Sequence, residues 1–396
     1  MKICWLHERT IFLVISGSRS YGFASQNSDW DYRGIAIPPL DSYIGLLGKF
    51  EQVVDSDKSK HVHTHYPSGL VQHDSDMQVM ELCKFANLAA QCNPSIIEIL
   101  FTNPDNFIIK HPVMDHILDN KHLFLSKMAY PRFCGYALSQ LKRINRHKRW
   151  LDNPPTHKPT REDFGLPEQG LLSQDQLGAA EALIQKEINE FMIDQTHLSE
   201  DTKIELNNGL ERMMRSIWVA LRDDAYPVGA NQKFESEQEA LYWSIAKNQG
   251  YSDNFLDILN REKKYRVRLK EWKSYQTWLS DRNPKRAELE KKYNYDTKNA
   301  THLVRLIRMC REILTDGVVN VSRPDSDELL AIRNGAWTYE QVVDFAEKEE
   351  ANLREVVKTS LLPKQADVKA IHKLIYNTIL EFNKKDLDGT VAQFCD

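Results

Sequence analysis

The sequence predicts an α+β protein in which a small region of strands and helices is followed by a much longer helical region. Up to about residue 76, short apolar runs of strand length alternate with turns that contain glycine or proline. From Met77 onward, apolar residues recur at helical spacing instead. A chain of 396 residues, 41% of them hydrophobic, can bury a sizeable core and is long enough for two domains.

Three runs in the first region have the character of strands: IFLVIS (11–16), YRGIAIP (32–38) and EQVVDS (51–56). The first run is apolar nearly throughout, as is typical of a central strand that is covered on both faces. Helices are predicted for residues 77–91 and 94–101. They are separated at Asn93, because a proline disfavours helical geometry in the residue before it.

The second region consists mainly of long amphipathic segments. They lie at residues 171–222, 235–293, 296–315, 338–357 and 364–384. A proline-rich connector without periodicity precedes them, near residues 152–170. We therefore expect a first domain over residues 1–110 and a helical domain over residues 111–396.

Composition restricts the partners and the compartment. The net charge of -4 gives no general attraction to nucleic acid or membranes, so such a partner must meet a local basic patch. No apolar stretch approaches the roughly 20 residues that a transmembrane helix needs. The six cysteines include no CxxC pair, which favours buried, reduced thiols and a cytoplasmic protein.

The segment ISGSRSYGFASQNSDWDYRG (residues 15–34) has features of a phosphate and metal site. At Gly17 the backbone can approach a phosphate closely, and the Ser18 hydroxyl and nearby amides can donate to it. Asp29 and Asp31 open the next predicted strand, where residues i and i+2 point to the same side. Two such carboxylates repel each other unless a cation lies between them, and oxygen ligands suit Mg²⁺ or Mn²⁺. Two ions of this kind can hold the attacking and leaving oxygens of a phosphoryl displacement.

A bare Asp-x-Asp pair is more often a solvated acidic loop or a turn cap. The complete pattern is far more specific: an apolar strand, a Gly-Ser turn, and Asp-x-Asp at the start of a second strand. This pattern resembles the signature of the DNA polymerase β nucleotidyltransferase superfamily. The sequence GSRSYG…SDWDYRG most resembles one branch, the RlaP-like predicted nucleotidyltransferases linked to RNA repair.

Later blocks are also similar to that branch. They read KFANLAAQCNPSIIEILF, RHKRWLDNPPTHKPTREDFGLP, YDTKNATHLVRLIRMCREIL and IRNGAWTYEQV. The resemblance therefore spans most of the chain, although residues 171–290 contribute little. It implies a small N-terminal mixed sheet like the polymerase β palm, with helices on one face, followed by a large all-helical domain.

The superfamily places a third carboxylate on a strand beside the first two. Here LVQHDSDMQVMELCKF offers Asp74 and Asp76, and the distance from the KF block favours Asp76. A competing local interpretation makes Ser75 a helix N-cap and leaves Asp76 in the first turn of that helix. Both aspartates could face one way in a strand, so Asp74 stays open as the third carboxylate.

The resemblance and the chemistry together imply a metal-dependent nucleotidyltransferase. It would move a nucleoside monophosphate from a nucleoside triphosphate to an acceptor hydroxyl and release pyrophosphate. Asp29, Asp31 and Asp76 would be the catalytic residues and would hold Mg²⁺ or Mn²⁺. Gly17 and Ser18 would bind the β- and γ-phosphates, with Arg19 and Arg33 flanking them. The acceptor favoured is an RNA end, such as that of tRNA. The alternatives are transfer to a protein side chain or small molecule, and a non-catalytic nucleotide-binding module.

One predicted helix face offers cations for the triphosphate. Lys298, His302 and Arg305 are spaced i, i+4 and i+7, so they share one side of the helix. A triphosphate brings about four negative charges into a partly dry site, and these need charged partners. We therefore expect this face to turn inward over the three aspartates and bind nucleotide, although a solvated basic stripe is the commoner role of such a face.

Three further stretches carry weaker indications. The segment LKRINRHKRW (141–150) is a candidate for contact with an RNA backbone, and REKKYRVRLKEWK (261–273) stays open between that role and a solvated face. The run HVHTHY holds His61, His63 and His65 at alternate positions. It is interpreted as a flexible or strand-edge run, because no cysteine or acidic partner stands at the spacing of a zinc site.

Overall fold

The computed structural model describes residues 3–24, 28–44, 49–55, 62–72, 75–168 and 252–384, with a few isolated positions between 175 and 246. The chain divides into two compact units. The first consists of Met1–Pro154 together with Asn283–Asp396, and the second of Pro155–Arg282. The first unit is therefore discontinuous in sequence.

The first unit contains a five-stranded mixed sheet with the order β3-β4-β2-β1-β5. The strands are β1 (Thr10–Ser16), β2 (Trp30–Ala36), β3 (Gln52–Val54), β4 (Ser75–Glu81) and β5 (Phe107–Lys110). Strands β2 and β4 are parallel, whereas the pairs β1–β2, β1–β5 and β3–β4 are antiparallel. This confirms the prediction of a mixed sheet near the N-terminus, and no further strand occurs in the described part of the chain.

Residues 75–81 form a strand, so the prediction of a helix from Met77 is wrong for the start of that segment. Their side chains alternate between the two faces of the sheet, with Met77 buried, and the backbone pairs with β2 on one side and β3 on the other. The helix α3 begins only at Leu82 and ends at Ala90. Its N-cap is Glu81, whose carboxylate accepts two backbone amide hydrogens. The interpretation of Ser75 as the N-cap is therefore also wrong.

The two faces of the sheet are covered differently. On one face Phe12 and Ile35 pack into a large apolar cluster with α3, α4 (Pro94–Leu100) and α5 (Val113–Asp119). On the other face Leu13 and Met77 pack with the N-terminal segment and with the short 3₁₀ turn η1 (Val62–His65). The long helices of this unit thus lie on the face that Phe12 and Ile35 point to.

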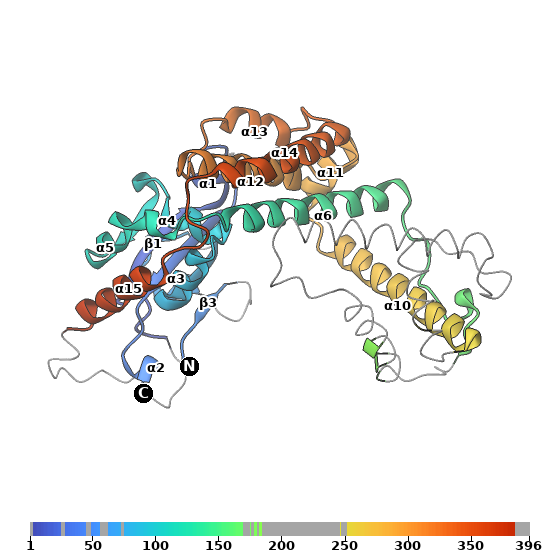
Figure 1. The fold of residues 1–396 in the computed structure, drawn as a ribbon, viewed down its shortest axis with the longest axis horizontal. Coiled ribbons are helices and arrows are strands. Elements are labelled where there is room, and N and C mark those ends of the chain that lie inside the picture. The colour runs from blue at the N-terminus through green and yellow to red at the C-terminus, as the bar shows by residue number, and fades with distance from the viewer. Residues whose placement is uncertain are drawn as a thin grey trace. The chain divides into compact units, whose positions relative to one another are not determined.

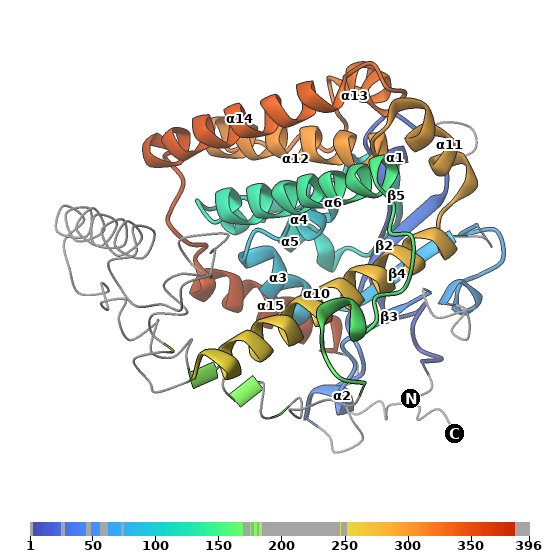
Figure 2. The ribbon, with the colours of Figure 1, turned by 90° about the vertical axis from the view of Figure 1, so that its right-hand side faces the viewer.

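Besides the short helices α1 (Gly17–Ser20) and α2 (Asp41–Ile44), six longer helices among the described residues belong to the first unit. They are α6 (Gly135–Asp152), α11 (Pro284–Tyr293), α12 (Thr297–Asp316), α13 (Ser326–Arg333), α14 (Tyr339–Thr359) and α15 (Val368–Phe382). Helix α12 packs against α6, α13 and α14, and α15 returns to α3 and α5 (Figures 1 and 2). Three of the predicted amphipathic segments correspond to α12, α14 and α15 within a few residues.

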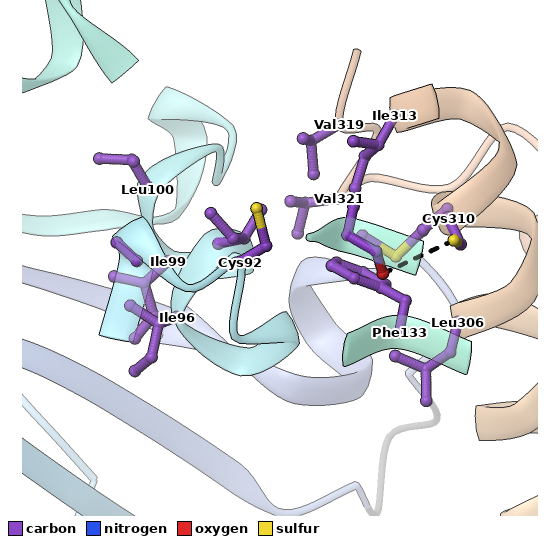
Figure 3. Packing of buried hydrophobic residues seen from close by; sticks show 14 of the residues in the cluster. Cys92, Ile96, Ile99, Leu100, Phe133, Leu306, Cys310, Ile313, Val319 and Val321 are labelled. Atoms are coloured by element: carbon purple, nitrogen blue, oxygen red, sulfur yellow. Dashed lines mark hydrogen bonds between the residues drawn. The ribbon is translucent and has the colours of Figure 1, made fainter. Parts of the chain in front are cut away.

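Helix α12 shares a core with the helices that cover the sheet. Figure 3 shows Ile96 and Ile99 of α4 on one side, Leu306 and Ile313 of α12 on the other, and Val321 between them. All five side chains belong to one cluster of buried residues. The apolar core is therefore continuous from the helices that cover the sheet to α12.

The second unit contains α10 (Asp253–Ser280) and the short turn η5 (Glu162–Phe164) among its described residues. Arg161 forms an ion pair with Glu262, which is buried on α10. Phe164 packs edge-on against Tyr265, with the ring centroids 5.8 Å apart. Most of the predicted segments 171–222 and 235–251 lies outside the described residues.

The domain boundary predicted at residue 110 stays a prediction. Among the described helices, those from α11 to α15 group with the sheet rather than with α10.

No helix in the described ranges has both the length and the apolar character needed to cross a lipid bilayer. Cys83, Cys92, Cys134 and Cys310 are free thiols, whereas Cys4 is disulfide-bonded, so the prediction of reduced cysteines is wrong for Cys4.

Candidate active site

Two aspartates lie side by side where β2 and β4 run parallel. Asp31 and Asp76 are register partners, so their side chains leave the same face of the sheet from adjacent strands about 4.8 Å apart. Along β2 this face continues with Arg33 and then with Ile35, which is buried in the core. The pleat therefore places the carboxylates at the margin of the apolar core. Asp74, the other candidate for the third carboxylate, lies outside the described residues.

The turn after β1 is in direct contact with one of these carboxylates. Ser16 is the register partner of Asp31, and the chain turns immediately after it. Gly17 has a φ of +67°, in the left-handed region, and a Cβ atom there would lie 2.1 Å from Oδ2 of Asp31. Both the backbone conformation and the close approach require glycine at this position. The predicted phosphate turn and the predicted metal ligand are thus neighbours.

The three predicted aspartates influence one another electrostatically. Asp29 is exposed and comes just before β2, two residues from Asp31. Burial raises the pKa of Asp31; Arg33 and Lys298 act to lower it, and the carboxylates of Asp76 and Asp29 raise it further. Three acidic groups gathered in this way favour a bound cation, which would relieve their repulsion.

The two flanking arginines have defined contacts. Nη2 of Arg33 donates to the carboxylate of Asp76 over 3.2 Å, and Nη1 donates to the Asp76 carbonyl over 3.0 Å. Arg19 donates to the carbonyl of Ser28 over 2.7 Å, and its guanidinium lies 3.8 Å from the centre of the Trp30 ring. Arg33 therefore orients Asp76, while Arg19 ties α1 (Gly17–Ser20) to the residues that lead into β2.

Helix α12 brings Lys298 to this group of carboxylates. The helix starts after Asp296, whose side chain accepts the backbone amide hydrogen of Asn299 as an N-cap. Lys298 is in the first turn and is exposed. Desolvation and the positive charges of Arg286 and Arg333 lower the pKa of Lys298, whereas Asp29 and Asp31 raise it. The ammonium group thus lies in the field of the candidate metal ligands.

A second cation near the carboxylates, Arg333 at the end of α13, was not among the predicted site residues. Desolvation and the charge of Arg286 lower the pKa of Arg333, and Asp29 raises it. The block IRNGAWTYEQV, which resembles the RlaP-like branch, contains this arginine and was the signal that could have identified it. Periodicity could not, because α13 is short and separate in sequence from α12.

His302 follows Lys298 by one helical turn and is neutral. Desolvation, together with the positive charges of Arg305 and Lys298, lowers the pKa of His302 to about 3. At neutral pH the imidazole therefore offers hydrogen bonding but no positive charge. The role of His302 in nucleotide binding stays a prediction.

Arg305 is buried, and its charge is paired within the protein. It is 3% exposed and forms an ion pair with Glu98 of α4. Its neighbours Leu303 and Leu306 are fully buried, so this part of α12 is enclosed by protein on nearly all sides. A charged side chain in such surroundings needs an internal partner. In the structure Lys298 lies near the aspartates, whereas Arg305 lies deeper in the core.

A buried polar cluster supports the start of α12. Ligand atoms of His147, Glu290 and Asp296 lie within 4.8 Å of one another, the spacing of a small metal site. Arg286 also forms ion pairs with both carboxylates. Burial opposes ionisation of Asp296, but the hydrogen bond from His147 and the charge of Arg286 hold its pKa below the usual value. Because Arg286 supplies the positive charge, we interpret the cluster as a structural network that joins α6, α11 and α12.

The other sequence candidates lie elsewhere. His63 and His65 are in η1, where His63 faces Asp55 over 3.6 Å, and His61 lies outside the described residues. The basic stretch 141–150 is part of α6, and the stretch 261–273 is part of α10 in the second unit. The structure holds both stretches in helices, and their role in RNA binding stays a prediction.

Comparison with known families gives a match for the N-terminal region. Residues 5–152 match the family described as RlaP: RNA repair pathway DNA polymerase beta family. The N-terminal region is RlaP-like. This confirms the resemblance that the Gly-Ser turn and the Asp-x-Asp pair indicated, and supports a nucleotidyltransferase. Searches of curated proteins and of solved structures gave no match. The RlaP match ends before α12, so the similar blocks after residue 290 lie outside it.

Proposed function

We propose that this RlaP-like protein transfers a nucleoside monophosphate from a nucleoside triphosphate to an acceptor hydroxyl. The acceptor oxygen bonds to the α-phosphorus, the bond from that phosphorus to the bridging oxygen breaks, and pyrophosphate leaves. The acceptor is an RNA end, tRNA included, in keeping with the RNA repair description of the matched family. The observation that carries the proposal is the register pairing of Asp31 with Asp76 beside the Gly17 turn.

The residues at this position fit a divalent metal ion. Asp29, Asp31 and Asp76 offer only carboxylate oxygens, the donors that Mg²⁺ and Mn²⁺ prefer. The Arg33 side chain donates to one carboxylate oxygen of Asp76, and the second oxygen can bind a metal ion. When bound, the metal supplies Lewis-acid stabilisation of the phosphate oxygens on which negative charge develops.

The remaining roles belong to residues of the turn and of α12 and α13. Ser18 and the amides near Gly17 donate to the β- and γ-phosphates, with Arg19 shaping the loop that follows. Lys298 and Arg333 both interact electrostatically with Asp29, one of the candidate metal ligands. Their positive charges can therefore neutralise part of the charge of a triphosphate bound there. Asp76, whose side chain is 52% exposed, assists removal of the proton from the acceptor hydroxyl.

Labelled nucleotide transfer tests this function directly. The full chain is incubated with Mg²⁺ or Mn²⁺ and each α-labelled nucleoside triphosphate. The acceptors offered are total tRNA, RNA with a free 3′ hydroxyl, RNA with a blocked 3′ end, and cell protein. We expect label on RNA with the free hydroxyl, and no transfer when EDTA removes the metal, since the carboxylates alone repel the phosphates.

Other outcomes assign the alternatives. Label on protein alone identifies a protein-modifying enzyme of the same chemistry. Binding of triphosphate without transfer to any acceptor identifies a nucleotide-binding module. Transfer that persists unchanged in EDTA contradicts the metal-dependent mechanism.

Replacement of Lys298 by alanine should weaken triphosphate binding. The ammonium group is a charge-assisted donor near the carboxylates, and losing it should cost about 1.5–3 kcal/mol in affinity. Isothermal titration with each triphosphate and Mg²⁺ measures this loss. Lys358→Ala is the control, because Lys358 is exposed on α14 and pairs only with Glu355 among the described residues. Wild-type affinity in Lys298→Ala would remove this residue from the site.

A further inference from the structure

A buried network joins three helices beneath the candidate site. Glu98 of α4 is 5% exposed, and both of its carboxylate oxygens are engaged. Oε2 accepts the hydroxyl of Tyr21 over 2.6 Å, and Oε1 accepts a hydrogen bond from Nη1 of Arg305. The guanidinium of Arg305 also lies 3.8 Å from the centre of the Tyr21 ring. The three side chains therefore contact one another pairwise.

The network connects the two parts of the site that would hold a triphosphate. Tyr21 is the C-cap of α1, and its N–H donates to the carbonyl of Gly17 over 3.2 Å. Arg305 follows Lys298 by two turns of α12, about 10 Å along the helix axis. Through Tyr21 the network holds the Gly-Ser turn, and through Arg305 it holds the helix that carries Lys298.

Stability does not explain why charged residues occupy these positions. A buried ion pair loses its hydration, and replacing such a pair with apolar side chains of similar volume is often neutral or stabilising. The surroundings are apolar, as Leu303, Leu306 and Ile307 show. An apolar pair could therefore fill the space, but it would allow α1 and α12 to slide against each other. Directional bonds from one carboxylate fix their relative position.

We propose that Glu98 is a positioning residue for the nucleotide site, and this inference rests on the proposed function. By binding Tyr21 and Arg305 together, it sets the separation between the Gly17–Ser18 turn and Lys298. The residue touches neither nucleotide nor metal. Replacing Glu98 should therefore weaken binding of the β- and γ-phosphates, which a triphosphate presents to the turn and to Lys298 and a monophosphate lacks.

The test compares triphosphate with monophosphate binding in a variant that keeps the core filled. In the double variant Glu98→Leu/Arg305→Met, apolar side chains replace the ion pair. We expect a melting temperature lowered by a few degrees at most, because the buried hydroxyl of Tyr21 loses its acceptor. The Kd for the triphosphate should rise about tenfold, and the Kd for the monophosphate should not change. A merely structural role would alter the melting temperature without changing the ratio of the two affinities.

A matched control uses another ion pair on the same helix. Arg311 of α12 pairs with Glu349 of α14, so Arg311→Met/Glu349→Leu makes the same exchange away from α1. This control should bind both nucleotides like wild type.

Two results overturn the proposal. One is a folded Glu98→Leu/Arg305→Met variant with the wild-type ratio of affinities. If that variant does not fold, Tyr21→Phe decides, because it removes one hydroxyl and leaves the ring in place. Its triphosphate Kd should rise about threefold, and an unchanged Kd would be the other overturning result. A wild-type protein that binds no triphosphate would refute the proposed function itself, and this inference with it.

Discussion

Replacing Asp31 by asparagine is expected to reduce nucleotidyl transfer by a factor of about 10³ or more while the protein stays folded. The amide is a poorer ligand for a divalent cation than the carboxylate and leaves the phosphate charge less well compensated. Asp29→Asn should act in the same way. Their melting temperatures without metal should be unchanged or higher, because a source of repulsion among three carboxylates has been removed.

Thermal melting and single-turnover transfer, measured on the same preparation, check this expectation. Asp115→Asn is a suitable control, because Asp115 is half exposed on α5 and pairs with Lys110 rather than with any site residue. It should keep full activity. A parallel loss of folding and activity in Asp31→Asn would show that the carboxylate has a structural role.

Gly17→Ala should also abolish most of the activity, by about 10² or more. A methyl group at this position would lie 2.1 Å from Oδ2 of Asp31, so either the carboxylate or the turn must move. A shift of about 1 Å in a positioning element is enough for a loss of this size. Left-handed backbone adds a strain of roughly 1–2 kcal/mol, which should lower the melting temperature by several degrees.

Gly317→Ala separates the two effects. Gly317 has nearly the same backbone conformation, with a φ of +66°, but no atom within 4 Å of the added methyl group. It should show the loss in melting temperature and retain transfer activity. If Gly17→Ala transferred nucleotide as well as Gly317→Ala does, the contact between the turn and Asp31 would have no functional importance.

Local patterns in the sequence were sufficient for part of this site. The apolar run 11–16, the glycine after it and the Asp-x-Asp pair predicted both strands and the turn, because each feature depends on neighbouring residues. The strand β4 was misread as the start of a helix, because Met77, Met80 and Glu81 run without a break into the helical spacing of α3. Only pairing with β2 shows that this segment is extended, and pairing is a long-range property.

The helical contribution to the site was predicted less well for a similar reason. Helical spacing correctly placed Lys298 and Arg305 on one side of α12, but that side runs from an exposed turn into the core. Burial changes along the helix, because Lys298 lies in the exposed first turn whereas Arg305 meets Glu98 of α4 in the core. Arg333 and Glu98 come from other helices, and no single helical period could connect them with Lys298.

The discontinuity of the first unit has a consequence for how the protein is made. During translation the sheet, the Gly-Ser turn and Glu98 leave the ribosome well before α12, since residues 155–282 are synthesised in between. Throughout that interval Glu98 lacks its partner Arg305, and the apolar face of α4 that packs against α12 is exposed to water or to chaperones. Asp29, Asp31 and Asp76 are therefore present on the nascent chain before Lys298 is synthesised. Packing of α12 against α4 is a late, long-range step, and we expect it to be slow compared with folding of the sheet.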